Sequence, residues 1–422
     1  MDTKAINQGL IKTVLYLAKK SPYYKRLFSD TGIDPYTIQS IDDLKNIPTT
    51  SKTELQNNNS DFFCIEPSDY ADIVSTSGTL GEPVVVPLTK NDIRRLAVNE
   101  AGSFTTAGVN NNDLVQLMVT LDMRFMAGLA YFEGIQKIGA ATLRIGPGSP
   151  AVQLENIRKF SPTVLVGVPG FISKIIDYTE KNNININHTS VKKIICIGDA
   201  IRDEKFELNS IGKRIKERWH IDLYSTYAST EMATSFTECN AGKGGHLQED
   251  LLVVEILDDE GNVLPYGELG EVTITTLGIE GMPLLRFRTG DMAFLVDRVC
   301  ECGRNAVRIS PIIGRKEQMI KYKGTTLYPA AIIDVLNKYT SVVNYYIEVN
   351  TDDNGIDQIQ IAIAIENETE ADECLSNLKD SFKVSLRVVP NIFIKSSKEI
   401  MEQISKNQGR KPKLFFDYRQ NI

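Results

Sequence analysis

The sequence lacks the features that define membrane, repeat and nucleic-acid-binding proteins. No apolar run in its 422 residues is long enough to span a bilayer. It contains no repeat at a spacing of about 20–50 residues and no low-complexity tract. Its formal net charge of −7 provides no overall positive potential for binding phosphate backbones. We therefore expect neither a membrane nor a nucleic acid among its partners.

A secretory leader is also missing. Apolar residues recur at helical spacing between Ile6 and Leu17, but lysines interrupt them, and neither an h-region nor a cleavage site follows. This pattern predicts an amphipathic surface helix in a cytoplasmic protein. The six cysteines need not form disulfides in a large cytosolic chain.

The sequence does contain an alternation of strands and helices. Short apolar runs, each bounded by Gly or Pro on at least one side, include residues 163–168 and 193–197, and helical stretches separate them. Buried strands separated by helices predict an α/β architecture. After about residue 250, residues 252–257 and 271–277 flank a turn rich in Asp and Gly, which predicts antiparallel strands.

A smaller unit is expected after Gly314. It combines strands at residues 342–349 and 358–366, a helix at 370–383 and a strand near 384–389. The predicted fold class is therefore α/β, with a large N-terminal domain (residues 1–313) of α/β layers and a β subdomain. A small, mobile α+β C-terminal domain (residues 314–422) completes it.

A loop rich in hydroxyl groups and glycine follows residue 72. Glycines let the backbone approach a ligand closely, and Ser and Thr add donors, as a triphosphate requires. The loop is not a Walker A motif, because no Gly-Lys-Ser/Thr follows at the right spacing. A flexible surface loop is the alternative. The candidate phosphate-binding residues are Ser75, Thr76, Ser77, Gly78, Thr79 and Gly81.

Three further segments occur in a fixed order: YSTYASTE at residues 224–231, RFRTGD at 286–291, and GRKEQMIK at 314–321 with Gly324 and Tyr328-Pro329. Together with the loop, they resemble the adenylate-forming superfamily over nearly the whole chain. The residues of these motifs are most similar to those of the phenylacetate–coenzyme A ligase branch. The resemblance implies a two-domain enzyme that binds ATP.

The resemblance also implies a role for individual residues. Glu231 would hold the Mg²⁺ that bridges the ATP phosphates, because Mg²⁺ prefers hard oxygen ligands and needs few of them. Asp291 would accept hydrogen bonds from both ribose hydroxyls, Tyr227 would stack on adenine, and Arg315 would lie near the nucleotide. Thr230 joins Glu231 as a catalytic candidate. The remaining nucleotide-binding candidates are Gly198, Asp199, Ala200, Tyr224, Ser225 and Thr226.

Two segments that follow strands are candidates for the acid pocket. In similar aryl-acid ligases the region of residues 122–132 lines this pocket, and residues 167–168 would form the opposite wall. Plain hydrophobic core is the alternative, because Met and aromatic residues at helical spacing are common there. The candidates are Phe125, Met126, Ala127, Tyr131, Gly167 and Val168.

Adenylation also needs a cation near the attacking carboxylate and the α-phosphate, because negative charge builds on the phosphorus oxygens. Similar enzymes use a lysine that follows a glycine in the C-terminal domain. Here Arg410 follows Gly409 directly, and Lys411 fits with a slip of one residue. Both stay candidates for catalysis, and a solvated basic tail is the alternative.

A second constellation consists of Cys239, His246, Cys300 and Cys302. Two short ligand pairs brought together by antiparallel strands suit a tetrahedral zinc ion with three thiolates and one imidazole. Because four protein ligands close the coordination sphere, the zinc would be structural. Unrelated surface residues are the alternative.

The predicted function is an ATP- and Mg²⁺-dependent acid–thiol ligase. A small carboxylic acid, aryl or arylacetic, would form an acyl-AMP and then pass its acyl group to coenzyme A. Transfer to an amine or to a carrier-protein thiol, an inactive nucleotide-binding regulator and a zinc-organised scaffold are the alternatives. The assembly is left open, with a homodimer as one alternative.

Overall fold

The computed structural model describes residues 3–76, 83–296, 299–352, 356–367, 369, 371–405 and 413–419. The chain divides into two compact units. The first contains Met1–Leu208 and Gly212–Ile312, and the second contains Asn209–Ile211 and Ile313–Ile422. Within the described ranges no helix combines the length and the apolar character needed to cross a membrane.

The main sheet of the first unit joins nine strands of the described chain in the order β13-β14-β9-β8-β7-β6-β5-β3-β4. Strands β3, β4, β5, β6 and β7 run parallel to one another, and β8, β9, β13 and β14 pair antiparallel with their neighbours. Their bounds are β3 (Leu114–Leu117), β4 (Ala141–Arg144), β5 (Val164–Gly167), β6 (Lys193–Ile197), β7 (Asp222–Ser229), β8 (Thr234–Glu238), β9 (Gly245–His246), β13 (Leu295–Val296) and β14 (Arg308–Ile309).

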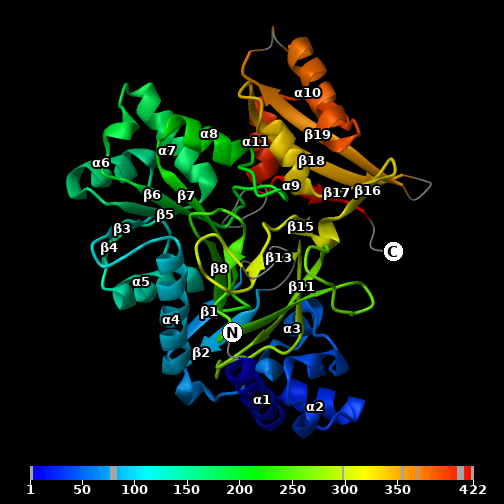
Figure 1. Ribbon diagram of the computed structural model, residues 1–422. Helices are drawn as coiled ribbons and strands as arrows, with labels where there is room; N and C mark the ends of the chain where they lie inside the picture. The colour runs from blue at the N-terminus through cyan, green and yellow to red at the C-terminus, as the bar shows by residue number, and fades with distance from the viewer. Residues whose placement is uncertain are drawn as a thin grey trace. The chain divides into compact units, whose positions relative to one another are not determined.

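Helices cover both faces of the parallel part of this sheet. Figure 1 shows α4 and α5 on one face and α6 and α7 on the other. Strand β5 is buried at every residue for this reason, as its continuous apolar run predicts. The helices of this unit are α1 (Thr3–Lys20), α2 (Pro22–Thr31), α3 (Lys52–Asn57), α4 (Lys90–Thr106), α5 (Met126–Ile138), α6 (Pro150–Phe160), α7 (Pro169–Lys181) and α8 (Ser210–Arg218).

The remaining strands of the first unit are antiparallel. Strand β1 (Asp72–Ser75) pairs with β2 (Val85–Leu88), and β11 (Gly270–Thr276) lies between β10 (Leu252–Leu257) and β12 (Phe287–Ala293). The buried guanidinium of Arg95 on α4 donates to the carbonyl oxygens of Leu277, Ala233 and Leu251 at 2.5–2.7 Å. One side chain therefore ties α4 to the β subdomain and to the turn before β8.

The second unit is an α+β sandwich. Its sheet has the order β20-β19-β18-β21 within the described residues. Alternate residues of β18 and β19 enter two cores: Ile347 and Ile361 pack with α9 and α10, whereas Tyr346 and Ala362 pack with α11. The elements are β15 (Gly314–Arg315), β16 (Ile320–Tyr322), β17 (Thr325–Leu327), α9 (Pro329–Leu336), β18 (Val342–Thr351), β19 (Asp357–Ile365), α10 (Ala371–Leu386), β20 (Asn391–Ile394), α11 (Ser397–Ser405) and β21 (Phe415–Asp417).

The predicted α/β fold is confirmed, but the strand expected near residues 384–389 is wrong. Helix α10 continues to Leu386, and the next strand begins at Asn391. The buried residues Cys374, Leu378 and Phe382 keep a spacing of four, which continues one helical face. Val384 is 83% exposed, so the apolar run that suggested a strand includes a surface position of the helix. The predicted mobility of the C-terminal domain stays a prediction.

Candidate active site

The predicted nucleotide residues of the first unit gather where parallel strands end. Strands that run parallel present their carboxyl ends at one edge of the sheet, which is where ligands of α/β proteins bind. Gly198 follows β6 directly, in a left-handed conformation with φ of 79°. Asp199 and Ala200 continue this turn, and β7 runs beside β6 with Ile197 opposite Thr226.

Tyr227 and Asp291 are brought together from β7 and β12. The Tyr227 hydroxyl donates a hydrogen bond to Oδ2 of Asp291 at 2.8 Å. Burial, together with the Asp291 charge, raises the pKa of Tyr227 well above its usual value, so the phenol stays protonated and keeps donating. The ring of Tyr227 stacks on Phe236 with centroids 5.7 Å apart. Tyr227, which is predicted to stack on adenine, therefore orients the carboxylate of Asp291, which is predicted to bind the ribose.

Glu231 lies just after β7 and is 8% exposed. The Nζ atom of Lys52 lies 3.4 Å from its Oε1. The sequence interpretation missed Lys52, although a local signal exists. Ser51 and Glu54 form a capping box that starts α3, and this places Lys52 at the first helical position. Thr230 lies beside Glu231 in the turn and is half-buried.

The neighbouring residues of β7 are held by a buried ion pair. Glu238 on β8 accepts a hydrogen bond from the Ser225 amide at 3.1 Å, and Arg202 donates to the same carboxylate at 3.0 Å. Thr226 meets Thr237 through their hydroxyls at 3.0 Å. Tyr224 is buried in the hydrophobic cluster described below. The backbone of β7 is thus held rigidly where the predicted adenine residues lie.

The start of the predicted phosphate loop is tied to the predicted acid pocket. The Ser75 amide donates to the Arg124 carbonyl at 3.0 Å, and Thr76 pairs with Val84 through backbone and hydroxyl at 3.0 Å. Met123 and Arg124 both adopt left-handed conformations, with φ of 59° and 58°. Four predicted loop residues, Ser77, Gly78, Thr79 and Gly81, lie outside the described residues, as do Arg410 and Lys411.

Most of the predicted acid-pocket residues share one hydrophobic cluster. Phe125, Ala127, Tyr131 and Val168 pack there together with Tyr224. The cluster spans the start of α5, the end of β5 and β7. In contrast, Met126 packs into another core cluster of this unit, because it lies on a different face of α5. Gly167 ends β5 beside Met118, whose methyl group would lie 2.7 Å from an added Cβ.

A buried polar network lies between α4 and β8, and it was not predicted from the sequence. Asn99 donates to Oε1 of Glu100 at 2.9 Å, and Ser103 contacts Thr237 on β8. Oε2 of Glu100 is buried without a hydrogen-bond partner among the described residues. Burial raises the pKa of Glu100 to about 7, although hydrogen bonds from Ser235, Asn99 and Ser103 lower it. In the sequence, the polar residues at helical spacing on α4 could have indicated this network.

The four predicted zinc ligands lie together, with all ligand atoms within 4.8 Å of one another. Sγ of Cys239 lies 3.6 Å from Sγ of Cys300, and Nε2 of His246 lies 3.4 Å and 3.6 Å from Sγ of Cys239 and Cys302. Tetrahedral zinc places sulfurs about 3.8 Å apart and sulfur and nitrogen about 3.6 Å apart. These three distances are therefore close to the edges of such a tetrahedron.

The protonation states of His246 and Cys302 suit a metal, whereas burial raises the pKa of the Cys239 thiol to about 12. Burial, with the charges of Arg304 and Arg308, lowers the pKa of His246 to about 4, so the imidazole is neutral and able to ligate. Burial raises the pKa of Cys302, but hydrogen bonds from Arg304 outweigh this effect and lower the pKa to about 7. Arg308 also donates to the carbonyls of Lys243 and Val299 at 2.7 and 2.9 Å, which joins the two ligand-bearing loops.

Arg315 belongs to the second unit, on β15, where it is half-buried.

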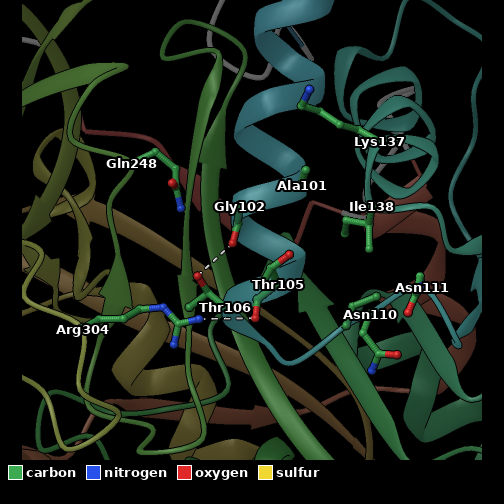
Figure 2. Close-up of a pocket in the computed structure, with 11 residues that line it drawn as sticks. Ala101, Gly102, Thr105, Thr106, Asn110, Asn111, Lys137, Ile138, Gln248 and Arg304 are labelled. Atoms are coloured by element: carbon green, nitrogen blue, oxygen red, sulfur yellow. Dashed lines mark hydrogen bonds between the residues drawn. The ribbon is translucent and has the colours of Figure 1, made fainter.

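A cavity of about 630 Å³ in the first unit is lined by none of the predicted residues. Figure 2 shows Gln248 and Arg304 on one side of α4, and Lys137 and Asn111 on the other. This cavity lies beside residues that precede β3 and β4, at the amino edge of the parallel strands, so it is opposite the edge where ligands bind.

The fold of the first unit, with Gly198 and Tyr227 at the carboxyl ends of parallel strands and Asp291 bonded to Tyr227, defines an adenylate-forming protein. The chain belongs to the family of AMP-binding enzymes, whose model matches residues 8–280. The predicted membership of the phenylacetate–coenzyme A ligase-like branch is confirmed as well. The chain is 29% identical to the phenylacetate-coenzyme A ligase of Thermus thermophilus, over 85% of this chain and 80% of that protein. With the Escherichia coli phenylacetate-coenzyme A ligase it shares 27%, over 81% and 78%.

Solved structures show the same fold. The 2-hydroxyisobutyryl-CoA ligase in complex with 2-HIB-AMP superimposes with a TM-score of 0.85 at 19% identity, over 98% of this chain and 89% of that one. The anthranilate CoA ligase AuaEII in complex with anthranoyl-AMP gives 0.59 at 19% identity, over 79% and 65%. At these identities the similarity establishes the fold only. The substrate has to be inferred from the residues of the site.

Proposed function

We propose that this protein is an ATP-dependent acid–coenzyme A ligase that acts on a small aryl or arylacetic acid. The single observation that carries the proposal is the constellation of Asp291, Tyr227 and Glu231 beside the carboxyl ends of the parallel strands. One oriented carboxylate would bind the ribose hydroxyls and the other would bind the cation of the phosphates, and the match to the family of AMP-binding enzymes supports these roles. The relatives named as phenylacetate-coenzyme A ligases support the acid and the acceptor.

The reaction has two steps. The acid carboxylate attacks the α-phosphorus of ATP, forming an acyl–O–P bond and breaking the bond to pyrophosphate. The coenzyme A thiol then loses its proton and attacks the acyl carbon, forming a thioester and releasing AMP. Asp291 accepts hydrogen bonds from the ribose hydroxyls, and Lys52 supplies positive charge beside Glu231. Mg²⁺ bound at Glu231 would neutralise phosphate charge. Arg410 and Lys411 are the candidates for the cation at the α-phosphate.

The preference for an aromatic acid rests on the apolar cluster. Phe125 is only partly buried and supplies aromatic surface, with Ala127 and Val168 beside it, whereas Tyr131 is 4% exposed and packs against the Phe104 ring. Such surface stacks on a ring and provides no partner for a second charge. Short or doubly charged acids are therefore expected to be poorer substrates than aryl and arylacetic acids.

Pyrophosphate exchange with ATP tests the first step. The wild-type protein is assayed with aryl, arylacetic, short acyl and dicarboxylic acids, and Asp291→Ala serves as the variant that loses ribose recognition. Acid-dependent exchange that Asp291→Ala abolishes supports the proposal. Binding of ATP without exchange for any acid would instead favour a nucleotide-binding regulator. Mass spectrometry of products formed with coenzyme A, an amine or a carrier protein then identifies the acceptor.

We also propose that the Cys239, His246, Cys300 and Cys302 cluster binds structural zinc. The support is the match of its distances to tetrahedral edges and the neutral imidazole. All four positions are protein ligands, so the metal would hold the loop after β8 to the segment before β14. Elemental analysis of the purified protein, with an expected ratio of about one zinc per chain, tests this proposal.

A further inference from the structure

The predicted ribose carboxylate stands in a β-bulge. On strands β11 and β12, Glu271 pairs with Met292 and Thr273 pairs with Arg288. One residue of β11 therefore lies opposite three residues of β12, which are residues 289–291. Bulges re-aim side chains and are common beside active sites. Here the extra residues carry Asp291 out of the regular ladder, toward the Tyr227 hydroxyl.

Two local hydrogen bonds of the Thr289 hydroxyl shape this bulge, but neither of them involves the Gly290 amide. The Thr289 hydroxyl donates to the Val272 carbonyl at 2.8 Å and accepts from the Asp291 amide at 3.1 Å. Gly290 between them has φ of 78°, a left-handed conformation that glycine adopts at little cost. Its amide takes part in neither of these contacts, so a further acceptor is needed to hold it.

Glu271 provides that acceptor. Its Oε1 accepts from the Gly290 amide at 3.2 Å, and its Oε2 accepts from Nη1 of Arg288 at 2.7 Å. The Glu271 residue is 5% exposed. Arg288 is fixed in turn by donating to the Asp258 carbonyl at 3.0 Å. A single buried carboxylate thus holds both the residue before the bulge and the glycine at its centre.

We propose that Glu271 is a positioning residue that sets the Asp291 carboxylate for the ribose hydroxyls of ATP. The inference rests on the proposed nucleotide site and deepens it. With only one side-chain oxygen left at position 271, the Gly290 amide and Nη1 of Arg288 would compete for it. Asp291 then loses its fixed position, although its bond to Tyr227 remains. The chemical step itself does not involve Glu271.

The test compares ATP with 2′-deoxy-ATP and 3′-deoxy-ATP in the exchange assay. Glu271→Gln keeps the size of the side chain and removes one of its two acceptors. We expect the KM for ATP to rise about tenfold, as for the loss of a buried charge-assisted hydrogen bond, with kcat little changed. The deoxy-nucleotides already lack a ribose contact, so their KM should rise less and the preference for ATP should shrink.

Glu255→Gln is the matched control. Glu255 is also a buried carboxylate paired with an arginine, Arg286, in the same group of strands, but it does not contact the bulge. The control should leave the ratio of KM values unchanged. If Glu271→Gln raises all three KM values equally, Glu271 is only structural and the inference fails. If Asp291→Ala leaves the ratio unchanged, the ribose assignment itself fails, independently of Glu271.

A second variant covers the case in which Glu271→Gln does not fold, as judged by circular dichroism. Thr289→Val removes the hydroxyl that shapes the same bulge while retaining the β-branched side chain. It should also reduce the preference for ATP over the deoxy-nucleotides. An unchanged preference in a folded Thr289→Val protein would overturn the inference that the bulge geometry sets ribose recognition.

Discussion

Replacing Glu100 by glutamine is expected to stabilise the first unit at neutral pH. Glu100 is buried between α4 and β8, one of its oxygens has no partner among the described residues, and burial raises its pKa to about 7. A glutamine has nearly the same shape and never ionises. Its amide group can donate toward the Ser103 and Ser235 hydroxyls, as a protonated carboxyl would.

The magnitude follows from proton linkage. In the unfolded chain a glutamate ionises near pH 4.5, whereas in the folded protein Glu100 ionises only near pH 7. Between these values the unfolded state gives up its proton first, so the free energy of unfolding falls as the pH rises. At about 1.4 kcal/mol per pH unit, the interval amounts to about 3 kcal/mol. Above pH 7 both states are ionised and the loss stays constant.

The assay is urea unfolding at several pH values from 4 to about 8, with the wild type and Glu100→Gln compared at each pH. The variant and the wild type should be equally stable near pH 4, and the advantage of the variant should grow up to about pH 7. Contributions from other groups cancel in this difference. Glu260→Gln, at an exposed position, serves as the control and should show no growing difference. Parallel curves for Glu100→Gln and the wild type would refute the reasoning.

Three further predictions concern the site and the metal cluster. Tyr227→Phe removes the hydroxyl that donates to Asp291, a buried bond to a charged group, so the KM for ATP should rise about tenfold or more; an unchanged KM would contradict the assignment. Lys52→Met removes the positive charge beside Glu231, so the Mg²⁺ concentration that gives half-maximal exchange should differ between this variant and the wild type. Identical Mg²⁺ titrations of the two proteins would contradict a role for Lys52 beside the cation. Cys300→Ser should lose bound zinc and melt at a lower temperature, matching chelator-treated wild type; full zinc content in the variant would exclude Cys300 as a ligand.

Local patterns were sufficient for much of the architecture. The apolar run at residues 193–197 became β6, and the alternation at 358–366 became most of β19, because burial on one or both faces is written into short stretches of sequence. The same rule failed near Val384, where a helix and a strand would both place apolar residues within a few positions of one another. Only the packing of Leu378 and Phe382 into the core of the second unit decides for the helix.

The sequence by itself determined the order of the motif segments and the choice of Cys239, His246, Cys300 and Cys302 as candidate metal ligands, because each is carried by residue types at short spacing. Tertiary structure alone decided which distant groups meet: Lys52 with Glu231, Glu271 with the bulge at residues 289–291, and Glu100 with β8. The physical reason is that hydrogen bonds and ion pairs act over a few ångströms. Pairs far apart along the chain are therefore set by how sheets and helices pack.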